Sequence, residues 1–265
     1  MELKMLAKEK DRVMLRINDV DISYVNSLRR YMAFEVPTMA IEEVEFRVNN
    51  SILYDEMVAH RLGLVPLKTD LDSYTLRSEC SCKGAGCAQC MLTLTLKAAG
   101  PKTVYASELK SKDPKIKPVY LQMPIVKLLE GQDISFEATA VLGKGKEHAK
   151  WSPGLVSYHH IPDILIKKEP ENAKEIVECC PKKIFEIKAG KLALNAEFER
   201  ECEFCEECIS VARPQGAIEI KKSNNFAFTV ESWGQLEPGE ILIKAIELFN
   251  DDLKEFAKLL ETIGE

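Results

Sequence analysis

The chain has 265 residues, of which 46% are apolar and 29% charged, and its formal net charge is −6 at pH 7. This composition is that of a globular protein with one large domain or two to three small ones. The acidic balance argues against direct, high-affinity DNA binding, because nucleic-acid-binding domains usually carry a basic stripe and the basic pieces here are short. No apolar run reaches the roughly 20 residues of a membrane-spanning helix, and the charged start does not resemble a signal peptide. We therefore expect a cytoplasmic protein without membrane contact.

The first 70 residues alternate between strand and helix patterns. Residues 11–19 place apolar side chains at every second position, which predicts a half-buried strand. Residues 21–36 place them at helical spacing, and the helix should end before the next proline. Residues 39–50 again read as a strand. Residues 53–67 predict a short helix that stops near Gly63 and continues as an extended segment.

The middle of the chain is predicted to be rich in β-structure. Short strands and loops are expected from residue 69 to 162, with the clearest strands at 92–98 and 134–143. Residues 164–223 form a compact stretch that is punctuated by cysteines. We therefore expect this stretch to be organised differently from the segment before it.

The chain closes with a predicted strand at 225–232 and a long helix from Pro238. Apolar residues in this helix follow steps of four and three: Leu242, Ile246, Phe249, Leu253, Phe256, Leu260 and Ile263. This spacing is typical of an a/d seam. The helix either lies on its own sheet or packs against another subunit, and further apolar residues beside the seam favour the shared interface.

Nine cysteines are many for a chain in a reducing compartment, where they are better explained as metal ligands than as disulfides. The first group has the spacing Cys80-x-Cys82-x4-Cys87-x2-Cys90, with glycines between its two halves. Four thiolates this close together suit a closed structural zinc site, which leaves no open position for catalysis. The alternatives are reduced thiols or a labile disulfide.

The second group, Cys202, Cys205 and Cys208, repeats every third residue, like the opening of a bacterial-type ferredoxin run. The fourth cysteine of such a run is replaced here by Ala212. In two-cluster ferredoxins that fourth cysteine precedes a proline and binds the other cluster. Cys180 also precedes a proline, so it would complete a single [4Fe–4S] site.

The second cluster of a ferredoxin pair has no ligand set in this chain. Cys179 is the only spare cysteine, and we do not expect it to be a ligand. Zinc in the same four ligands, or thiols without metal, are the alternatives to one cluster. The sequence contains no nucleophile elbow, phosphate-binding loop or other recognisable active-site motif.

Several stretches of the chain, in order, resemble the alpha-type subunits of cellular RNA polymerases. They are "NSLRR" (26–30), "VPTMAIEEVEF" (36–46), "LYDEMVAHRLGLVPL" (53–67), "GKGKEHAKWSP" (143–153) and "LEPGEILIKAIELF" (236–249). The ferredoxin-like insert is similar to that of the archaeal branch of this family, whose members resemble the third-largest subunit of the eukaryotic enzyme.

This resemblance implies an α+β fold of three domains. A discontinuous dimerisation domain would comprise residues 1–44 and 224–265, and a second, mostly β domain would span 45–163 and carry the cysteine loop 80–90. A ferredoxin-like iron–sulfur domain would occupy 164–223. The first cysteine group falls where eukaryotic relatives carry a zinc loop.

The resemblance also implies a function. The chain would be a non-catalytic assembly platform of DNA-directed RNA polymerase that pairs with the small subunit L and recruits subunit N and the large catalytic subunits. Arg29 and Arg30 match arginines that lie near the contact with the second-largest subunit. The rival hypothesis is an iron–sulfur redox or redox-sensing protein that docks a partner enzyme.

Overall fold

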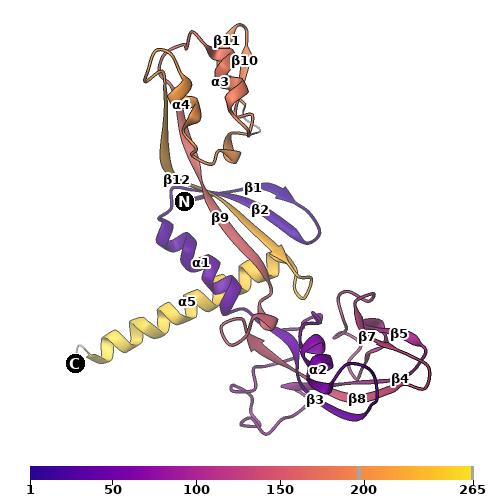
Figure 1. Ribbon diagram of the computed structural model, residues 1–265. Coiled ribbons are helices and arrows are strands. Elements are labelled where there is room, and N and C mark those ends of the chain that lie inside the picture. Colours follow the sequence, from indigo (N-terminus) through magenta and orange to yellow (C-terminus); the bar gives the residue numbers. More distant parts are fainter. Residues whose placement is uncertain (196–197, 264–265) are drawn as a thin grey trace. The chain divides into compact units, whose positions relative to one another are not determined.

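The structure, a computed structural model, describes residues 1–195 and 198–263 (Figure 1). The side chain of Ile263, the last member of the predicted seam, lies outside the described part, as do residues 264–265 of the predicted dimerisation domain. The fold mixes helices and strands, as expected for the α+β class, whereas the iron–sulfur insert stays a prediction. Among the described helices, none is both long and apolar enough to cross a membrane.

The helices occupy both ends of the chain and the cysteine-rich part. They are α1 (Ile22–Phe34), α2 (Asp55–Gly63), α3 (Ala173–Cys179), α4 (Glu207–Val211) and α5 (Pro238–Ile263). The strands are β1 (Glu2–Lys8), β2 (Arg12–Asn18), β3 (Pro37–Asn49), β4 (Met91–Ala99), β5 (Lys102–Tyr105), β6 (Lys110–Ser111), β7 (Pro124–Leu128), β8 (Asp133–Lys144), β9 (Gly154–Ile166), β10 (Phe185–Lys188), β11 (Lys191–Leu194) and β12 (Ile218–Ser232). The predicted helices are confirmed.

Most of the segment 69–162 consists of short strands and loops, as predicted, but two of its strands are longer than expected. β8 has 12 residues and β9 has 13. β8 lies between β3 and β4 and pairs with both, so its length is supported on each side. The closing strand also begins earlier than expected, at Ile218.

The chain divides into two compact units. The first comprises Met1–Lys8, Val13–Asn26 and Ser157–Thr229, and the second comprises Glu9–Arg12, Ser27–Val156 and Val230–Glu265. β9 and β12 continue through both units, and they belong to a four-stranded sheet of order β1-β2-β12-β9. The predicted domain boundaries 44/45, 163/164 and 223/224 therefore fall inside strands rather than in loops.

Cysteines and apolar side chains share one small core in the first unit. The core contains Ile176 of α3, Cys208 of α4 and Phe185 of β10. Strands β10 and β11 form a hairpin whose two turn residues, Ala189 and Gly190, have φ values of 50° and 78°. Positive φ at both positions matches the right-handed twist of the paired strands, which explains the tight connection.

The second unit has its core on the sheet of order β3-β8-β4-β6. β4 and β8 alternate, so every second side chain of each strand lies in this core, and α2 contributes the buried Val58 and Leu62. The burial follows from the period of two in a strand and the apolar face of a short helix. This unit also contains the cysteine loop between α2 and β4.

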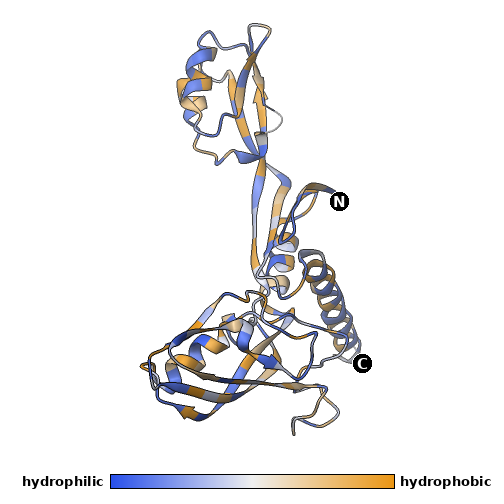
Figure 2. Cartoon of the chain, turned by 90° about the vertical axis from the view of Figure 1, so that its right-hand side faces the viewer, coloured by the Kyte–Doolittle hydropathy of each residue, from blue (hydrophilic) through white to orange (hydrophobic). Residues whose placement is uncertain are grey.

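Helix α5 changes character along its length. It begins at Pro238, a favoured first helical residue, and the Glu240 carboxylate accepts a hydrogen bond of 2.9 Å from the Glu237 backbone N–H. Ile241 and Ala245 are buried, but every residue from 250 to 262 is exposed. Apolar positions alternate with polar ones along this helix, as the colouring in Figure 2 shows. The first half is therefore part of the core, and the second half is not.

Candidate metal centres and interaction surfaces

The loop that carries the first cysteine group is folded into consecutive tight turns. The N–H of Lys83 donates to the carbonyl of Cys80, and the N–H of Cys90 donates to that of Cys87. Lys83, Gly84 and Gly86 have positive φ values, and a Cβ at Gly86 would lie 2.5 Å from Sδ of Met91. The φ of 93° at Gly86 favours glycine there, because other side chains rarely adopt this conformation.

The four thiols of this loop have the spacing of a single-ion site. The ligand atoms of Cys80, Cys82, Cys87 and Cys90 all lie within 4.8 Å of one another. The Sγ atoms of Cys80 and Cys87 are 3.5 Å apart, those of Cys82 and Cys90 3.6 Å, and those of Cys87 and Cys90 3.9 Å. Zinc–sulfur bonds of about 2.3 Å in a tetrahedral site place sulfur atoms about 3.8 Å apart. The donor set and its spacing therefore fit one zinc ion.

The pKa values of two thiols in this loop are shifted in opposite directions. A backbone hydrogen bond from Cys82 is the main cause that lowers the pKa of Cys80 to about 6. Burial raises the pKa of Cys90 to about 12. A thiolate is the form that binds a metal, so Cys80 is prepared to bind, whereas a cation would have to displace the proton from Cys90.

The second cysteine group surrounds a cavity in the first unit. The cavity is lined by all four predicted cluster ligands, Cys180, Cys202, Cys205 and Cys208, together with apolar side chains that include Ile184, Phe185 and Ile220. Their thiols do not have the close spacing of a single-ion site within the described residues. In a four-iron cluster each cysteine binds a different iron, so its ligands are spread more widely. A cavity lined by four thiols fits the predicted cluster, which stays a prediction.

Local backbone geometry sets the positions of these four residues. Cys180 follows the last residue of α3, and Cys208 lies in the first turn of α4. Phe204 and Glu206, which flank Cys205, have φ values of 55° and 60°. These left-handed residues bend the chain between Cys202 and Cys208, and all three cysteines line the same cavity.

Burial is the main cause of the pKa shifts of Cys202 and Cys208 in the second cysteine group. It raises the pKa of Cys208 to about 12 and also raises the pKa of Cys202. Without a cation, a buried thiolate is poorly solvated, so these side chains stay neutral thiols at neutral pH.

Two further positions bear on the predicted ligand set: Cys179, which is not expected to be a ligand, and Ala212, which replaces the fourth ferredoxin cysteine. The Cys179 thiol donates to the carbonyl of Ile176 at 3.3 Å, and its residue does not line the cavity. Ala212 occupies the place of the missing fourth ferredoxin cysteine, and it is 1% exposed within the same apolar core. A methyl group therefore fills the space where a second ligand set would begin.

The predicted seam of α5 is covered at its start and exposed at its end. Leu242, Ile246 and Phe249 are half-buried. Leu253, Phe256 and Leu260 are 49%, 59% and 52% exposed. The ring of Phe249 lies 4.8 Å from that of Tyr31, whose hydroxyl donates to Asp252 at 2.6 Å. The seam thus begins against α1 and continues as an uncovered apolar surface.

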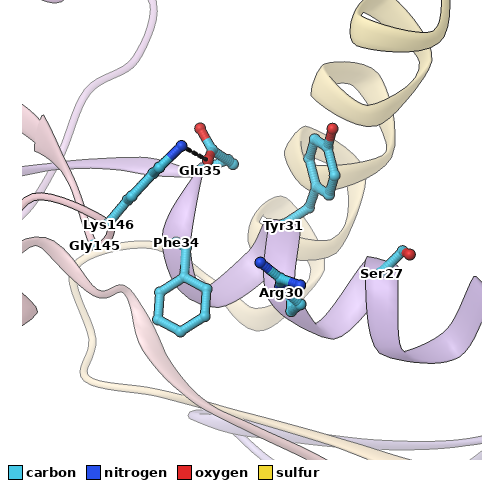
Figure 3. A pocket seen from close by; sticks show the side chains of 7 residues that line it. All are labelled: Ser27, Arg30, Tyr31, Phe34, Glu35, Gly145 and Lys146. Atoms are coloured by element: carbon cyan, nitrogen blue, oxygen red, sulfur yellow. Dashed lines mark ion pairs between the residues drawn. The ribbon is translucent and has the colours of Figure 1, made fainter. Parts of the chain in front are cut away.

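Arg30 lines a pocket at the end of α1, which is drawn in Figure 3. The other lining residues are Ser27, Tyr31, Phe34, Glu35, Gly145 and Lys146. Arg29 is half-buried and does not line this pocket. The sequence does not single out Glu35, Tyr31 or Lys146 as site residues, although Lys146 belongs to a short basic piece and to one of the family stretches.

Comparison with known proteins finds one family model and several relatives that match this chain. A family model for the RNA polymerase Rpb3/RpoA insert domain matches residues 44–162. DNA-directed RNA polymerase subunit Rpo3 of Archaeoglobus fulgidus is 36% identical over 99% of this chain and 98% of its own length. Rpo3 of Methanosphaera stadtmanae is 37% identical over 95% of each chain. DNA-directed RNA polymerase II subunit rpb3 of Dictyostelium discoideum is 36% identical over 95% of this chain and 92% of its own.

A mixed α and β fold with this insert domain is characteristic of RNA polymerase subunits of the alpha type. The chain belongs to the Rpo3/Rpb3 family of DNA-directed RNA polymerase subunits. The predicted resemblance and the predicted role as an assembly subunit in transcription are thereby confirmed, and the alternative of a redox protein is not favoured.

Proposed function

We propose that the chain is the non-catalytic assembly platform of a cytoplasmic RNA polymerase, pairing with the small subunit L and recruiting subunit N and the large catalytic subunits. The second half of α5 carries this proposal. Leu253, Phe256, Leu259 and Leu260 are each about half exposed in consecutive turns of one helix. An apolar surface of this kind is a liability in water unless another chain covers it.

The seam has the periodicity of a helix that packs against another helix. Residues at steps of four and three lie on one side of α5, so a partner helix can place its own side chains between them. Burying aromatic and aliphatic anchors of this size is what stabilises most subunit interfaces. The small subunit L is the partner that the family resemblance assigns to this helix.

The platform would consist of three domains. Residues 1–44 and 224–265 would pair with subunit L, and 45–163 would form the second domain. Residues 164–223 would form the iron–sulfur domain. The apolar cores on β3-β8-β4 and around α3 and α4 support separate folding of the latter two.

Two metal groups would stabilise this platform. Cys180, Cys202, Cys205 and Cys208 would hold one [4Fe–4S] cluster, and Cys80, Cys82, Cys87 and Cys90 one zinc ion. Bound metal would supply cross-links between segments that have few other contacts, and its binding free energy would be folding free energy. The thiol of Cys179, the last residue of α3, donates to the carbonyl of Ile176, so this residue would stay outside the ligand set.

Reconstitution from separately purified subunits of the same organism tests the assembly role. With the chain present, the small subunit and the large subunits should elute as one complex that synthesises RNA on a template. With the chain omitted, the small subunit should elute alone. A complete, active complex that forms without this chain would show that it is not the platform.

A further inference from the structure

A pocket of about 270 Å³ in the second unit is lined in part by the turn after β12 and by the segment that leads into β7. Gly234 in this turn has a φ of 88°, and a Cβ there would lie 2.5 Å from a methyl carbon of Val119. Glycine therefore allows the turn to pack closely against the segment. The N–H of Trp233 donates to the carbonyl of Pro153 at 3.0 Å, which holds the turn in place.

Most of the pocket wall is apolar. Two aromatic side chains line it and stay partly open to solvent, Trp233 at 43% exposed and Tyr120 at 48%. Leu64, Pro66 and Met123 add aliphatic surface. Aromatic and aliphatic walls of this kind favour a ligand that is itself a ring, because rings pack on one another and leave water together.

The charged residue of the wall, Lys150, is already neutralised by its own chain. Its ammonium group forms an ion pair with Glu42, donates to the carbonyl of Ile41 at 3.0 Å and lies 4.4 Å from the ring centre of Trp151. Only 12% of the Lys150 side chain is exposed. A cation that is satisfied on these sides attracts an anion weakly, so the pocket suits a neutral group.

Gln235 gives the wall a hydrogen-bond acceptor that is not used. The residue is 4% exposed, and its Nε2 donates to Oγ1 of Thr38 at 3.4 Å. The Thr38 hydroxyl donates its proton to the carbonyl of Trp151 at 2.7 Å, so it can only accept from Gln235, which fixes the orientation of the amide. Within the described residues, no donor reaches the buried Oε1 of Gln235. A ligand that donates to this atom would remove the cost of leaving it unpaired.

We propose that this pocket receives a tryptophan side chain from another polymerase subunit, whose indole N–H donates to Oε1 of Gln235 while its ring packs against Tyr120 and Trp233. An indole is neutral and carries one donor and no acceptor, which matches the wall. Tryptophan is also enriched among the residues that contribute most to binding at protein interfaces.

The size of the pocket supports a side chain rather than a small-molecule ligand. Its volume of about 270 Å³ lies below the range of about 300–1,000 Å³ that is common for small-molecule sites. The inference rests on the chain's family, which makes other polymerase subunits its partners, and not on the seam of α5 or on either metal group.

Two tryptophan analogues test the hydrogen bond in the full-length chain. N-acetyl-tryptophanamide carries the indole N–H, and the same compound methylated at the indole nitrogen does not. We expect the first to shift the indole N–H signal of Trp233 in NMR spectra and to bind at least about fivefold more tightly than the second. The signal of Trp151, whose indole donates to the carbonyl of Val141, should not move. Equal affinities, or no shift of Trp233 at millimolar concentrations, would overturn the proposal.

Gln235→Met separates the hydrogen bond from the shape of the pocket. Methionine has a similar length but accepts hydrogen bonds only weakly, so the two analogues should bind this variant with equal affinity. Gln122→Met, at an exposed glutamine close in sequence to Tyr120, is the control and should keep the wild-type preference. A preference that persists in the folded Gln235→Met variant would show that Oε1 is not the acceptor.

Photo-cross-linking in the complete polymerase identifies the occupant. Leu121→p-benzoylphenylalanine places a reactive group beside Tyr120 at a residue that is 48% exposed, and it leaves the wall intact. Mass spectrometry should find it linked to a tryptophan-containing segment of another subunit. Links only to segments without tryptophan, or only within the chain, would overturn the proposal.

The outcomes separate this pocket from the platform role. Loss of the analogue preference would overturn the pocket assignment and leave the proposed function standing. An active polymerase that assembles without this chain would contradict the platform role, whereas the binding of the analogues to the free chain would be unaffected.

Discussion

At the level of single residues, the two cysteine groups differ in the spacing of their thiols. Cys80 and Cys87 have sulfur atoms 3.5 Å apart, which fits one tetrahedral ion. Cys180 and Cys208 instead line a cavity, with no single-ion grouping among the described residues. This difference in spacing supports the proposal that the two groups hold different metals.

Serine substitutions test the cluster ligands one by one. Cys180→Ser, Cys202→Ser, Cys205→Ser and Cys208→Ser should each lose iron and inorganic sulfide in anaerobic preparations, because a hydroxyl is a poor ligand for a cluster. Cys179→Ser is the matched control and should keep both, since its thiol bonds to the backbone of α3. Iron retained in Cys180→Ser and lost in Cys179→Ser would reverse the assignment.

The cysteine loop should bind zinc independently of the cluster. Cys87→Ser should reduce zinc from about one ion per chain to near zero and make the 76–91 loop sensitive to proteases, because the metal holds its turns together. Iron content should not change. Ser81→Ala, in the same loop but without a thiol, is the control. Zinc that remains bound in Cys87→Ser would contradict the four-cysteine site.

Asp70 provides a pH test of the second unit. A hydrogen bond from Lys115, at 2.7 Å, is the main cause that holds the pKa of Asp70 at about 2, below its ordinary 3.8. A carboxylate with a lowered folded-state pKa stabilises the fold above its ordinary pKa, and this stability is lost as the pH falls toward 2. Asp70→Asn should therefore lose less stability than the wild type between pH 4 and 2 in urea titrations. Equal losses would show that the ion pair has no net effect.

At the level of secondary structure, α5 connects the core of its own unit to an uncovered surface. Its buried face, Ile241 and Ala245, ends before Phe249, and the apolar seam continues beyond it. The helix has 26 residues, and after Asp252, which accepts from Tyr31, the residues from 253 to 262 are all exposed. Tertiary packing usually supplies most helix stability, so this half should depend on a partner.

Charges placed on the exposed seam should prevent pairing with the small subunit. Phe256→Glu with Leu260→Glu should weaken pairing by at least about 30-fold, the effect of losing one strong interface anchor. These two residues are better targets than Phe249, which also packs on Tyr31. Lys258→Glu, an exposed residue on the opposite side of α5, is the control. Unchanged affinity in the double variant would show that the seam does not face this partner.

Many of the helices and strands could be predicted from the sequence. Periodicity located α1, α2 and α5 because their apolar residues recur at helical spacing, and alternation located β2, β3 and β8. The early start of β12 at Ile218 was missed, since Lys221, Lys222 and the following polar residues interrupt its apolar pattern. Strand pairing across the chain, which extends β9 and β12, does not depend on local sequence.

The candidate site could be predicted only in part, because contacts between segments far apart in the chain are not visible in the local sequence. Cysteine spacing pointed to the loop at 80–90, whose four thiols lie within 4.8 Å of one another because they are close in sequence. The four-cysteine cluster set stays a prediction. The pocket around Arg30 brings α1 together with a turn more than 100 residues away, so only tertiary structure shows that Lys146 belongs to it. Glu35 was missed because it looks like any surface carboxylate until its two lysine partners are seen.

At the level of the whole molecule, the chain is a subunit of DNA-directed RNA polymerase. Its family membership makes other RNA polymerase subunits its partners. In the proposed platform role, the chemistry of RNA synthesis resides in the large catalytic subunits.

The purified chain should show no template-dependent RNA synthesis with Mg²⁺ and nucleoside triphosphates. The same assay with the reconstituted polymerase is the positive control. RNA synthesis by the chain free of other subunits would contradict the non-catalytic role.

Native mass spectrometry of the chain mixed with the small subunit L tests the central claim most directly. We predict a complex that contains one copy of each subunit, and this complex should acquire the second-largest subunit when that is added. Because α5 presents the seam, the Phe256→Glu and Leu260→Glu double variant should appear as free subunits under the same conditions. A chain that stays alone at micromolar concentrations of both wild-type subunits, or that pairs only with itself, would contradict the account.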